Sequence, residues 1–316
     1  MTADNTTQRI ISRSVRGEED FWLVRNLLIE TWPITPPDFN WDVRRWDGSY
    51  FHNEEAGWDA RWGKYEDNGI RLWETEDGRL VGAVHPEGAG EAFLQLHPDY
   101  RHIEEEMIAW AEEHLSVPTE DGTERLLRIF VYEYDSPRRS LLERRGYEKT
   151  SHGGVIRRLR FGNKQIPRPV IAEGYILRTT RPDDDDCRKI ADLFNAAFNR
   201  DIHTAKEIRT FMASSPSYRN DLDLVAEAPD GTLAALVGMI YDEVNRYGLF
   251  EPVCTHPDHQ RRGLAGTLMF EGLHRVRALG ATEAYVGTGD QVDANRLYES
   301  IGFTVVHKGY IWRKVF

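Results

Sequence analysis

The chain has 316 residues, of which 40% are hydrophobic and 29% are charged, and its formal net charge is −12. This length exceeds what one hydrophobic core usually holds, so two domains are expected. The acidic balance argues against general binding to nucleic acid or to an anionic membrane surface. No apolar run is long enough for a membrane-spanning helix, and residues 1–9 lack the apolar segment of a signal peptide. With only Cys187 and Cys254 in the chain, these features predict a cytoplasmic protein without a disulfide framework.

The first half is predicted to contain six strands and three helices. Turn signals such as Asp77-Gly78 separate apolar stretches of strand character. The strands are expected at 10–12, 70–74, 80–84, 92–96, 127–131 and from 147 onward, and the helices at 19–30, 103–115 and 137–145. Eight of the nine tryptophans lie in this half, and several fall between the first helix and the second strand. They are interpreted as packed core residues, with an aromatic pocket wall as the alternative.

The second half shows the same order of elements. Strands are expected at 175–179, 222–228, 233–241, 247–255, 284–287, 303–306 and 310–313, and helices after residue 186 and at 204–212, 264–279 and 293–301. Four aspartates at 183–186 precede the first of these helices. Acidic residues stabilise a helix N-terminus, so they are predicted to form the cap and first turn rather than a metal site.

Several short features recur about 150 to 160 residues apart, in the same order. They pair Asp77-Gly78 with Asp230-Gly231, His97-Pro98-Asp99 with His256-Pro257-Asp258, and Gly146-Tyr147 with Gly302-Phe303. The preserved order favours duplication of one domain over chance. The expected organisation is a first domain at 1–162, a linker at 163–174 that carries two prolines, and a second domain at 175–316.

The segment 251–269 is the strongest chemical signal in the chain. It is predicted to be a strand, a basic loop and the start of a helix. Gly263, Ala265 and Gly266 leave backbone N–H groups unshielded at the helix N-terminus, an arrangement that binds phosphate or pyrophosphate. Neighbouring side chains offer further contacts to anionic oxygen: Gln260, Arg261 and Arg262.

This strand, the loop Gln260-Arg261-Arg262-Gly263-Leu264-Ala265 and the later Leu297-Tyr298-x-x-x-Gly302-Phe303 resemble the GNAT superfamily of acyl-CoA N-acyltransferases. The loop pattern of that family is Gln/Arg-x-x-Gly-x-Gly/Ala. The motifs cover about 247–303, and the order of elements covers 175–316. The resemblance implies an α+β fold of two tandem GNAT-type domains, each with a mixed, mostly antiparallel central sheet flanked by helices.

The resemblance implies acetyl-CoA as co-substrate and no metal. Loop residues would hold the coenzyme pyrophosphate, chiefly through their amides: Gln260, Arg261, Arg262, Gly263, Leu264, Ala265, Gly266 and Thr267. The backbones of Val253, Cys254 and Thr255 would pair with pantetheine as an added strand does, and the Val253 N–H would stabilise the oxyanion. Asn295 would contact pantetheine, although the position at which the family often has asparagine is Gln291 here.

Two residues are the candidates for proton transfer. Tyr298 is expected to protonate the departing thiolate, with a core tyrosine as the alternative. Glu251, expected on the same strand face as Val253, is the candidate base for the acceptor amine, and an exposed strand glutamate is the alternative. Cys254 is interpreted as a core residue rather than a nucleophile, and the nearby histidines lack the spacing of a zinc site.

The first half is expected to be a degenerate copy. Glu104, Glu105 and Glu106 stand where a phosphate loop needs glycines, and Leu142 stands at the tyrosine position. Side chains and negative charge there would exclude phosphate, so this half is expected to shape the acceptor pocket or to serve as a structural partner. The predicted function is transfer of an acetyl group to the amine of a small molecule by direct attack in a ternary complex. The alternative is a non-catalytic acyl-CoA-binding or regulatory module, and the oligomeric state stays open.

Overall fold

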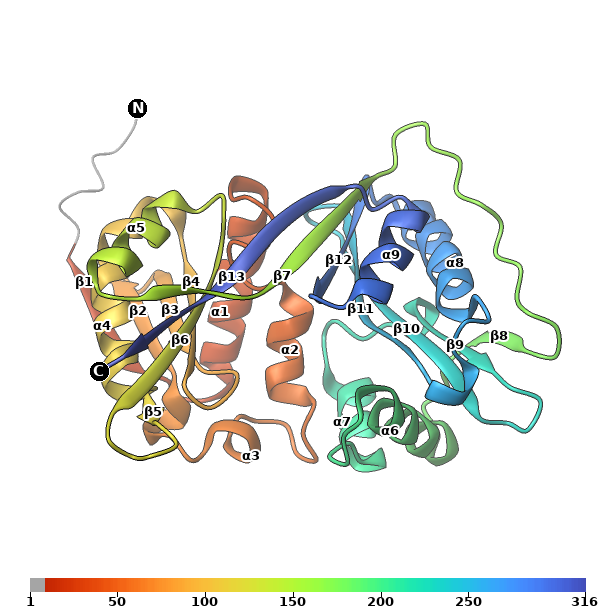
Figure 1. The fold of residues 1–316 in the computed structure, drawn as a ribbon, viewed down its shortest axis with the longest axis horizontal. Coiled ribbons are helices and arrows are strands. Elements are labelled where there is room, and N and C mark those ends of the chain that lie inside the picture. Colours follow the sequence, from red (N-terminus) through yellow and green to blue (C-terminus); the bar gives the residue numbers. More distant parts are fainter. Residues whose placement is uncertain (1–8) are drawn as a thin grey trace. The chain divides into compact units, whose positions relative to one another are not determined.

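The computed structural model describes residues 9–316; residues 1–8, on which the expectation about a signal peptide rests, lie outside the described residues. The chain divides into two compact units (Figure 1). Among the described residues, unit 1 contains 9–49, Gly57–Gly154 and His307–Phe316, and unit 2 contains Tyr50–Ala56 and Val155–Val306. These units are groups of residues that pack together. The domain boundaries expected from the sequence, at 1–162, 163–174 and 175–316, instead divide the chain into consecutive segments, and they stay a prediction.

Unit 1 holds a mixed sheet in the order β1-β2-β3-β4-β6-β13. The strands are β1 (Ile10–Ser14), β2 (Arg71–Thr75), β3 (Leu80–His85), β4 (Glu91–Leu96), β6 (Arg125–Tyr132), β13 (Val305–Val315) and the short β5 (Val117–Pro118), which pairs with β6. The main helices are α1 (Glu18–Thr31), α2 (Val43–Phe51), α3 (Asp59–Trp62), α4 (Glu104–His114) and α5 (Ser136–Arg144). The β4–β6 pair is parallel and the other pairs with known register are antiparallel.

Unit 2 repeats this design with the order β12-β11-β10-β9-β8. Its strands are β8 (Ile176–Thr179), β9 (Asp223–Glu227), β10 (Leu233–Asp242), β11 (Tyr247–Thr255) and β12 (Glu283–Gly289), and its helices are α6 (Asp184–Phe198), α7 (Ala205–Ser214), α8 (Leu264–Leu279) and α9 (Val292–Ile301). Only the β11–β12 pair is parallel among those with known register. The mixed, mostly antiparallel α+β fold predicted from sequence is confirmed in both units.

The helices of unit 2 cover both faces of its sheet (Figure 1). Alternate strand residues divide between two cores, because successive side chains of a strand point to opposite faces. Leu224 and Val237 pack with Leu268 of α8, whereas Val225 and Leu236 pack with the α6 cluster. The acidic run before α6 forms its cap, as predicted: Asp183 accepts a hydrogen bond from the Asp186 N–H at 2.9 Å.

The two strands expected at 303–306 and 310–313 are a single strand, β13. Gly309 lies within it, and a Cβ at this position would lie 2.4 Å from the Phe130 ring. The glycine therefore permits close approach of β6 and is not a turn. The pairing runs from Gly309↔Tyr132 to Val315↔Leu126. The last ten residues of the chain thus complete the sheet of unit 1, which the order of elements did not predict.

The strand β7 (Glu148–Arg160) makes the complementary exchange. Its residues up to Gly154 belong to unit 1, and those from Val155 belong to unit 2, where β7 neighbours β12. Each unit therefore contains a strand segment contributed by the other half of the sequence.

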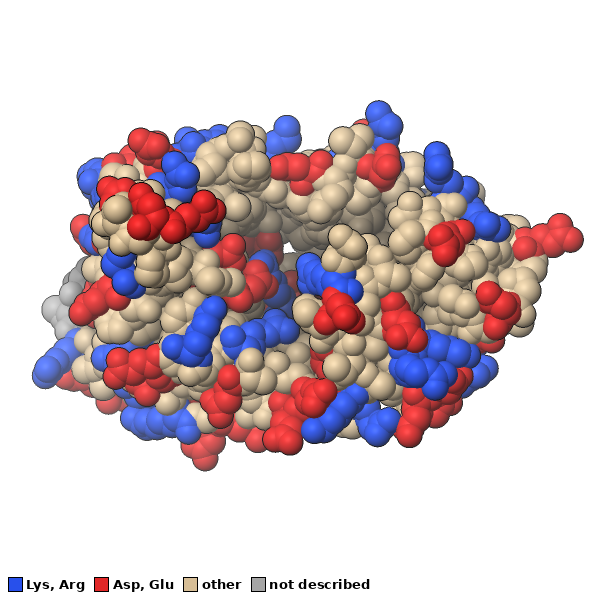
Figure 2. Space-filling view, turned by 60° about the horizontal axis from the view of Figure 1, so that its bottom comes forward, with Lys and Arg blue, Asp and Glu red and all other residues tan. Residues whose placement is uncertain are grey.

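Most tryptophans of the first half are buried, whereas Trp22 is exposed. Trp46, Trp58 and Trp62 are buried, and neighbouring rings in this series lie 5.4 and 6.4 Å apart between centroids. This agrees with the core interpretation. Among residues 9–316 no helix is long and apolar enough to cross a membrane. Basic and acidic side chains are interspersed over the face drawn in Figure 2 rather than gathered by sign.

Candidate active site

The two central strands of unit 2 part in the middle of β11. The parallel pairing of β11 with β12 runs from Tyr247↔Glu283 to Phe250↔Val286 and is not found beyond that point among the described residues. Residues 251–255 therefore pair with β10 on one side only. This leaves one backbone edge of β11 available to a ligand.

The direction of the free amides follows from the register. The His256 N–H donates to the Ala234 carbonyl of β10 at 2.9 Å. Because backbone groups in an antiparallel pair point alternately toward and away from the partner strand, the N–H groups of Thr255 and Val253 point away from β10, into the opening. The Cys254 amide points toward β10. Two of the three strand residues expected to meet pantetheine therefore present free donors, and the third does not.

A bulge at the point of divergence changes the side-chain phase. Val253 pairs with Val237 and Phe250 with Met239, so Glu251 and Pro252 together oppose Gly238. A Cβ on Gly238 would lie 2.8 Å from the Glu251 carbonyl oxygen, which explains the glycine. The expectation that Glu251 and Val253 share a strand face is wrong, because the extra residue reverses the alternation between them.

The loop before α8 has the geometry of an anion cradle. Gly263, the residue before the helix, has a left-handed backbone (φ 73°) and offers no side chain to cap it. The first helical bond joins the Thr267 N–H to the Gly263 carbonyl at 3.0 Å. The intervening N–H groups of Leu264, Ala265 and Gly266 are thus left for an external acceptor. Leu264 is itself buried, so only its backbone can serve this role.

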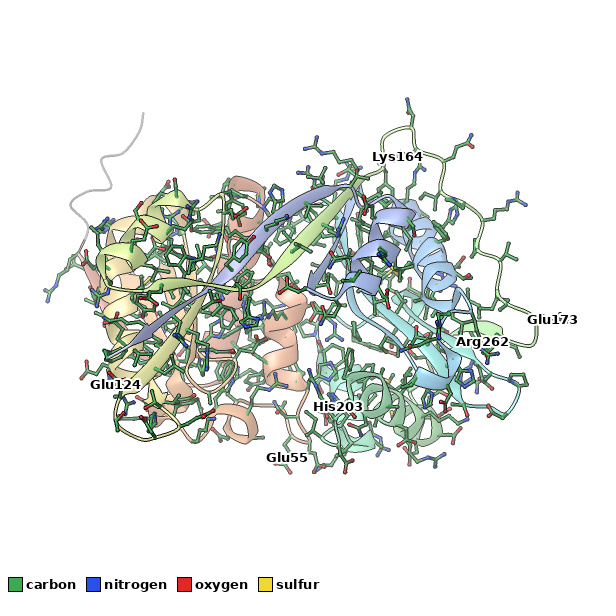
Figure 3. The ribbon with its side chains drawn as sticks, viewed as in Figure 1. Glu55, Glu124, Lys164, Glu173, His203 and Arg262 are labelled. Atoms are coloured by element: carbon green, nitrogen blue, oxygen red, sulfur yellow. The ribbon has the colours of Figure 1, made fainter. Side chains whose placement is uncertain are left out.

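The side chains around this loop are cationic and exposed. Gln260, Arg261 and Arg262 lie at the surface, and no ion pair of either arginine is found among the described residues. Arg262 is labelled in Figure 3. Together with the positive end of the α8 dipole, they make this position favourable for a multiply charged phosphate group.

Sequence reasoning missed the contacts that Tyr175 and Val170 make beside this loop. The Tyr175 hydroxyl lies 2.8 Å from His259 Nδ1, and the Arg262 guanidinium lies over the Tyr175 ring at 5.9 Å. The expected linker also packs beside α8: Thr267 Oγ1 donates to the Val170 carbonyl at 3.1 Å. No local pattern signals these contacts, because they join residues about 80 to 100 positions apart.

Tyr298 lies on α9 and is buried, with 5% of its surface exposed. Burial, with smaller contributions from Cys254 and Glu251, raises the pKa of Tyr298 to about 12. The phenol is therefore protonated at neutral pH. No hydrogen bond of its hydroxyl is found among the described residues. This is the state required of a proton donor.

Asn295 is held by other protein groups. Its Nδ2 donates to the carbonyls of Gly289 and Gln291 at 3.0 and 2.9 Å, and its Oδ1 accepts from Arg157 Nε at 3.0 Å. Arg157 also donates to the Phe303 carbonyl at 3.1 Å. Arg157, contributed by β7, was missed by sequence reasoning; it fixes both ends of α9 and so the position of Tyr298. The expected contact of Asn295 with pantetheine stays a prediction.

Cys254 is buried, and His256 takes part in the turn before the loop. Burial raises the pKa of the Cys254 thiol to about 12, so the nucleophilic thiolate is scarce at neutral pH. His256 Nδ1 accepts from the Asp258 N–H at 3.2 Å in the turn before the loop. Within residues 9–316 no cluster of three or more metal-ligating side chains is found.

Comparison with known proteins agrees with this geometry. Residues 188–303 match the acetyltransferase (GNAT) family. A mycothiol acetyltransferase of Kineococcus radiotolerans is 28% identical over 247 residues, which cover 74% of this chain and 77% of that protein. Residues 188–303 therefore match an acyltransferase domain, and the family of that domain uses acetyl-CoA as co-substrate.

Two solved structures share the fold over nearly the whole chain. A GCN5-related N-acetyltransferase from Sphaerobacter thermophilus superposes with a TM-score of 0.63 at 18% identity, covering 97% of this chain and 95% of its own. A tandem GNAT protein from the clavulanic acid biosynthesis pathway gives 0.63 at 16% identity, covering 97% and 98%. Residues 188–303, within unit 2, thus match the GNAT acetyltransferases, and the chain shares its fold with a tandem GNAT protein.

Proposed function

We propose that unit 2 transfers an acetyl group from acetyl-CoA to the amine of a small molecule, by direct attack in a ternary complex. The observation that carries this proposal is the combination of the opened edge of β11 with the uncapped N-terminus of α8. One offers strand-like hydrogen bonds to pantetheine, and the other offers amides to pyrophosphate. Both lie in the segment of the chain that matches the family.

The coenzyme is held by backbone groups in this proposal. The amides from Arg261 to Gly266 bind pyrophosphate, while Gln260, Arg261 and Arg262 add side-chain contacts. The Thr267 N–H, expected to join them, is instead bonded to the Gly263 carbonyl. The outward N–H and C=O groups of Thr255 and the Val253 carbonyl pair with the pantetheine amides. The Val253 N–H is assigned to the thioester carbonyl, where it stabilises the oxyanion that forms during attack.

Proton transfer is assigned to two side chains. The acceptor enters as an ammonium and loses a proton to Glu251, directly or through a water, before the neutral amine attacks the carbonyl carbon. The carbon–sulfur bond then breaks, and Tyr298 donates its phenolic proton to the departing thiolate. The new amide nitrogen loses its extra proton, which restores the phenol. Glu251 is exposed, and its negative charge contributes to the raised pKa of Tyr298.

The test is acetyl transfer by the purified chain, followed by mass spectrometry over a panel of primary amines. Deacetylated mycothiol belongs in the panel because a relative is a mycothiol acetyltransferase. The expected result is an acetylated product and free coenzyme A in equal amounts. Saturable acetyl-CoA binding without turnover of any amine would instead favour the non-catalytic acyl-CoA-binding module.

A further inference from the structure

A small cavity lies in unit 1, at the place where its own central strands part. The parallel β4–β6 pair is limited to Glu91↔Arg128 and Ala92↔Ile129. Beyond these residues, both strands line a cavity of about 30 Å³, together with the segment 38–41 and the start of α5. The cavity thus occupies the position in unit 1 that corresponds to the acyl end of the coenzyme site in unit 2.

The chain itself occupies the pantetheine edge of this unit. The His97 N–H donates to the Val81 carbonyl of β3 at 2.9 Å, so the Leu96 N–H points away from β3. Asn40 Oδ1 accepts from that N–H at 2.8 Å, and Asn40 Nδ2 donates to the Leu96 carbonyl at 3.1 Å. The Trp41 N–H donates to Gln95 Oε1 at 2.8 Å. The segment 38–41 therefore satisfies the strand edge that a coenzyme would need.

The charged side chains at the position of the phosphate loop also pair with one another. Glu104, which stands where the loop needs a small residue, forms a buried ion pair with Arg138 and a second pair with Arg101 at 3.0 Å. Arg101 also pairs with Asp135 at 2.7 Å. Because these side chains pair with one another, no phosphate-binding loop adjoins the cavity. A coenzyme is therefore not its ligand.

Among the described residues, one carboxylate that lines the cavity forms no ion pair. Arg45 is paired with Glu87, while Arg101 and Arg138 are paired with Asp135 and Glu104. Asp38 accepts a hydrogen bond from the Tyr132 hydroxyl, but among the described residues it forms no ion pair. Burial raises the pKa of Asp38 to about 6, and the nearby charge of Arg45 offsets this only in part.

Asp38 is also held in an uncommon backbone conformation, with φ 63°. Side chains other than glycine adopt this left-handed region at a cost, and such residues gather at functional sites. Two tyrosine rings stand beside the carboxylate: Tyr132 and Tyr134 are stacked at 5.3 Å. Their π-systems attract a cation in addition to the carboxylate.

We propose that this cavity binds the aminomethyl end of a small primary ammonium compound, with Asp38 as its counter-ion. A water needs roughly 10–15 Å³ on the same scale, so the volume admits two or three heavy atoms. An ammonium group supplies three donors in a compact cation. A divalent metal needs several oxygen ligands, and the lining offers one unpaired carboxylate and no metal-ligating cluster among the described residues.

Methylammonium is the appropriate probe, titrated at pH 7.5 into the full chain labelled with ¹⁵N-tryptophan. Trp41 lines the cavity, so its indole signal reports binding, and the other tryptophans serve as internal references. We expect a saturable shift of the Trp41 signal with a dissociation constant of about 10 mM, near the limit for a ligand of two heavy atoms. Methanol, which has the same size and no charge, is expected to cause no such shift.

The decisive variant is Asp38→Asn, because asparagine also tolerates the left-handed backbone. It is expected to weaken methylammonium binding at least tenfold, while the matched control Asp121→Asn, in an exposed turn of the same unit, leaves it unchanged. No saturable Trp41 shift in the unmodified chain, or an equal response to methanol, would overturn the proposal even if the variant did not fold. Equal affinity of Asp38→Asn would do the same.

Acetyl-CoA binding by the same samples separates this inference from the function of unit 2. Asp38→Asn is expected to bind acetyl-CoA as the unmodified chain does, because the assigned coenzyme site contains no residue of unit 1. Loss of acetyl-CoA binding in the unmodified chain would count against the proposed function alone, and loss of the methylammonium response would count against the cavity alone.

Discussion

The side chain of Asn40 forms two hydrogen bonds with the backbone of Leu96, one to its N–H and one to its carbonyl. Leu96 precedes the first His-Pro-Asp turn of the chain, as Thr255 precedes the second. For Thr255 the outward N–H has no such partner among the described residues. Asn40 therefore occupies the edge of β4 in the first half, whereas the corresponding edge of β11 in the second half is open.

This asymmetry predicts that the chain binds one molecule of acetyl-CoA. A second molecule in unit 1 would have to displace Asn40 and leave its buried amide without partners, at a cost of roughly 1–3 kcal/mol for each lost group. Isothermal titration calorimetry should give a stoichiometry near one. Two equivalent sites per chain would show that the segment 38–41 does not block the strand edge.

Gly263→Glu should reduce acetyl-CoA affinity at least 100-fold. The substitution places a negative charge where phosphate is expected and forces a non-glycine residue to adopt φ 73°. Space is not the reason, because a Cβ there meets no atom within 4 Å. Gly263→Ala tests the backbone alone and should cost about tenfold or less. The matched control is Gly231→Glu, which sits at φ 85° in the β9–β10 turn; a loss of the same size there would remove the phosphate assignment.

Tyr298→Phe should lower kcat by about 10²–10⁴, the usual contribution of a general acid, and leave the KM for acetyl-CoA nearly unchanged. The phenylalanine ring fills the same buried space, so the fold should be retained. Steady-state kinetics with a thioester whose thiol has a lower pKa provides the control, because a better leaving group should recover part of the lost rate. Unchanged turnover would return Tyr298 to the role of a core residue.

Glu207 is expected to make the free energy of unfolding depend on pH in the acidic range. Burial alone would raise its pKa, but hydrogen bonds and charge from His203 and His52 lower it to about 2. Because the folded pKa is depressed, the stabilisation is present above the unfolded value of about 4.3 and is lost as pH falls toward 2. Glu207→Gln should therefore lower the free energy of unfolding by about 2–3 kcal/mol at pH 5 and much less at pH 2. Urea denaturation at both values measures this; a difference independent of pH would rule out titration of Glu207 as its source.

The sequence allowed prediction of elements that have strong local patterns. It did not allow prediction of elements and residue roles that depend on long-range contacts. The apolar period of 264–279 and its terminal Gly280 located α8 to the residue, and the loop motif located the anion cradle. The helix α2 was missed because Asp47 and Gly48 are poor helix formers; burial of Trp46 and Val43 stabilises it instead. The roles of Asn40 and Arg157 depend on partners 56 and 138 residues away, which no local spacing encodes.

Removal of residues 307–316 should unfold unit 1 in preference to unit 2, although these residues end the second half of the sequence. They supply the strand that pairs with β6 from Leu126 to Tyr132, and without it the backbone groups and buried side chains on that side of β6 lose their partner. Trp312, a buried member of the unit 1 core, is lost as well. Hydrogen exchange should therefore show a loss of protection in β6, while β10, which pairs only with β9 and β11, serves as the internal control. Retained protection in β6, or equal loss in both strands, would argue against exchange of the terminal strand between the two units.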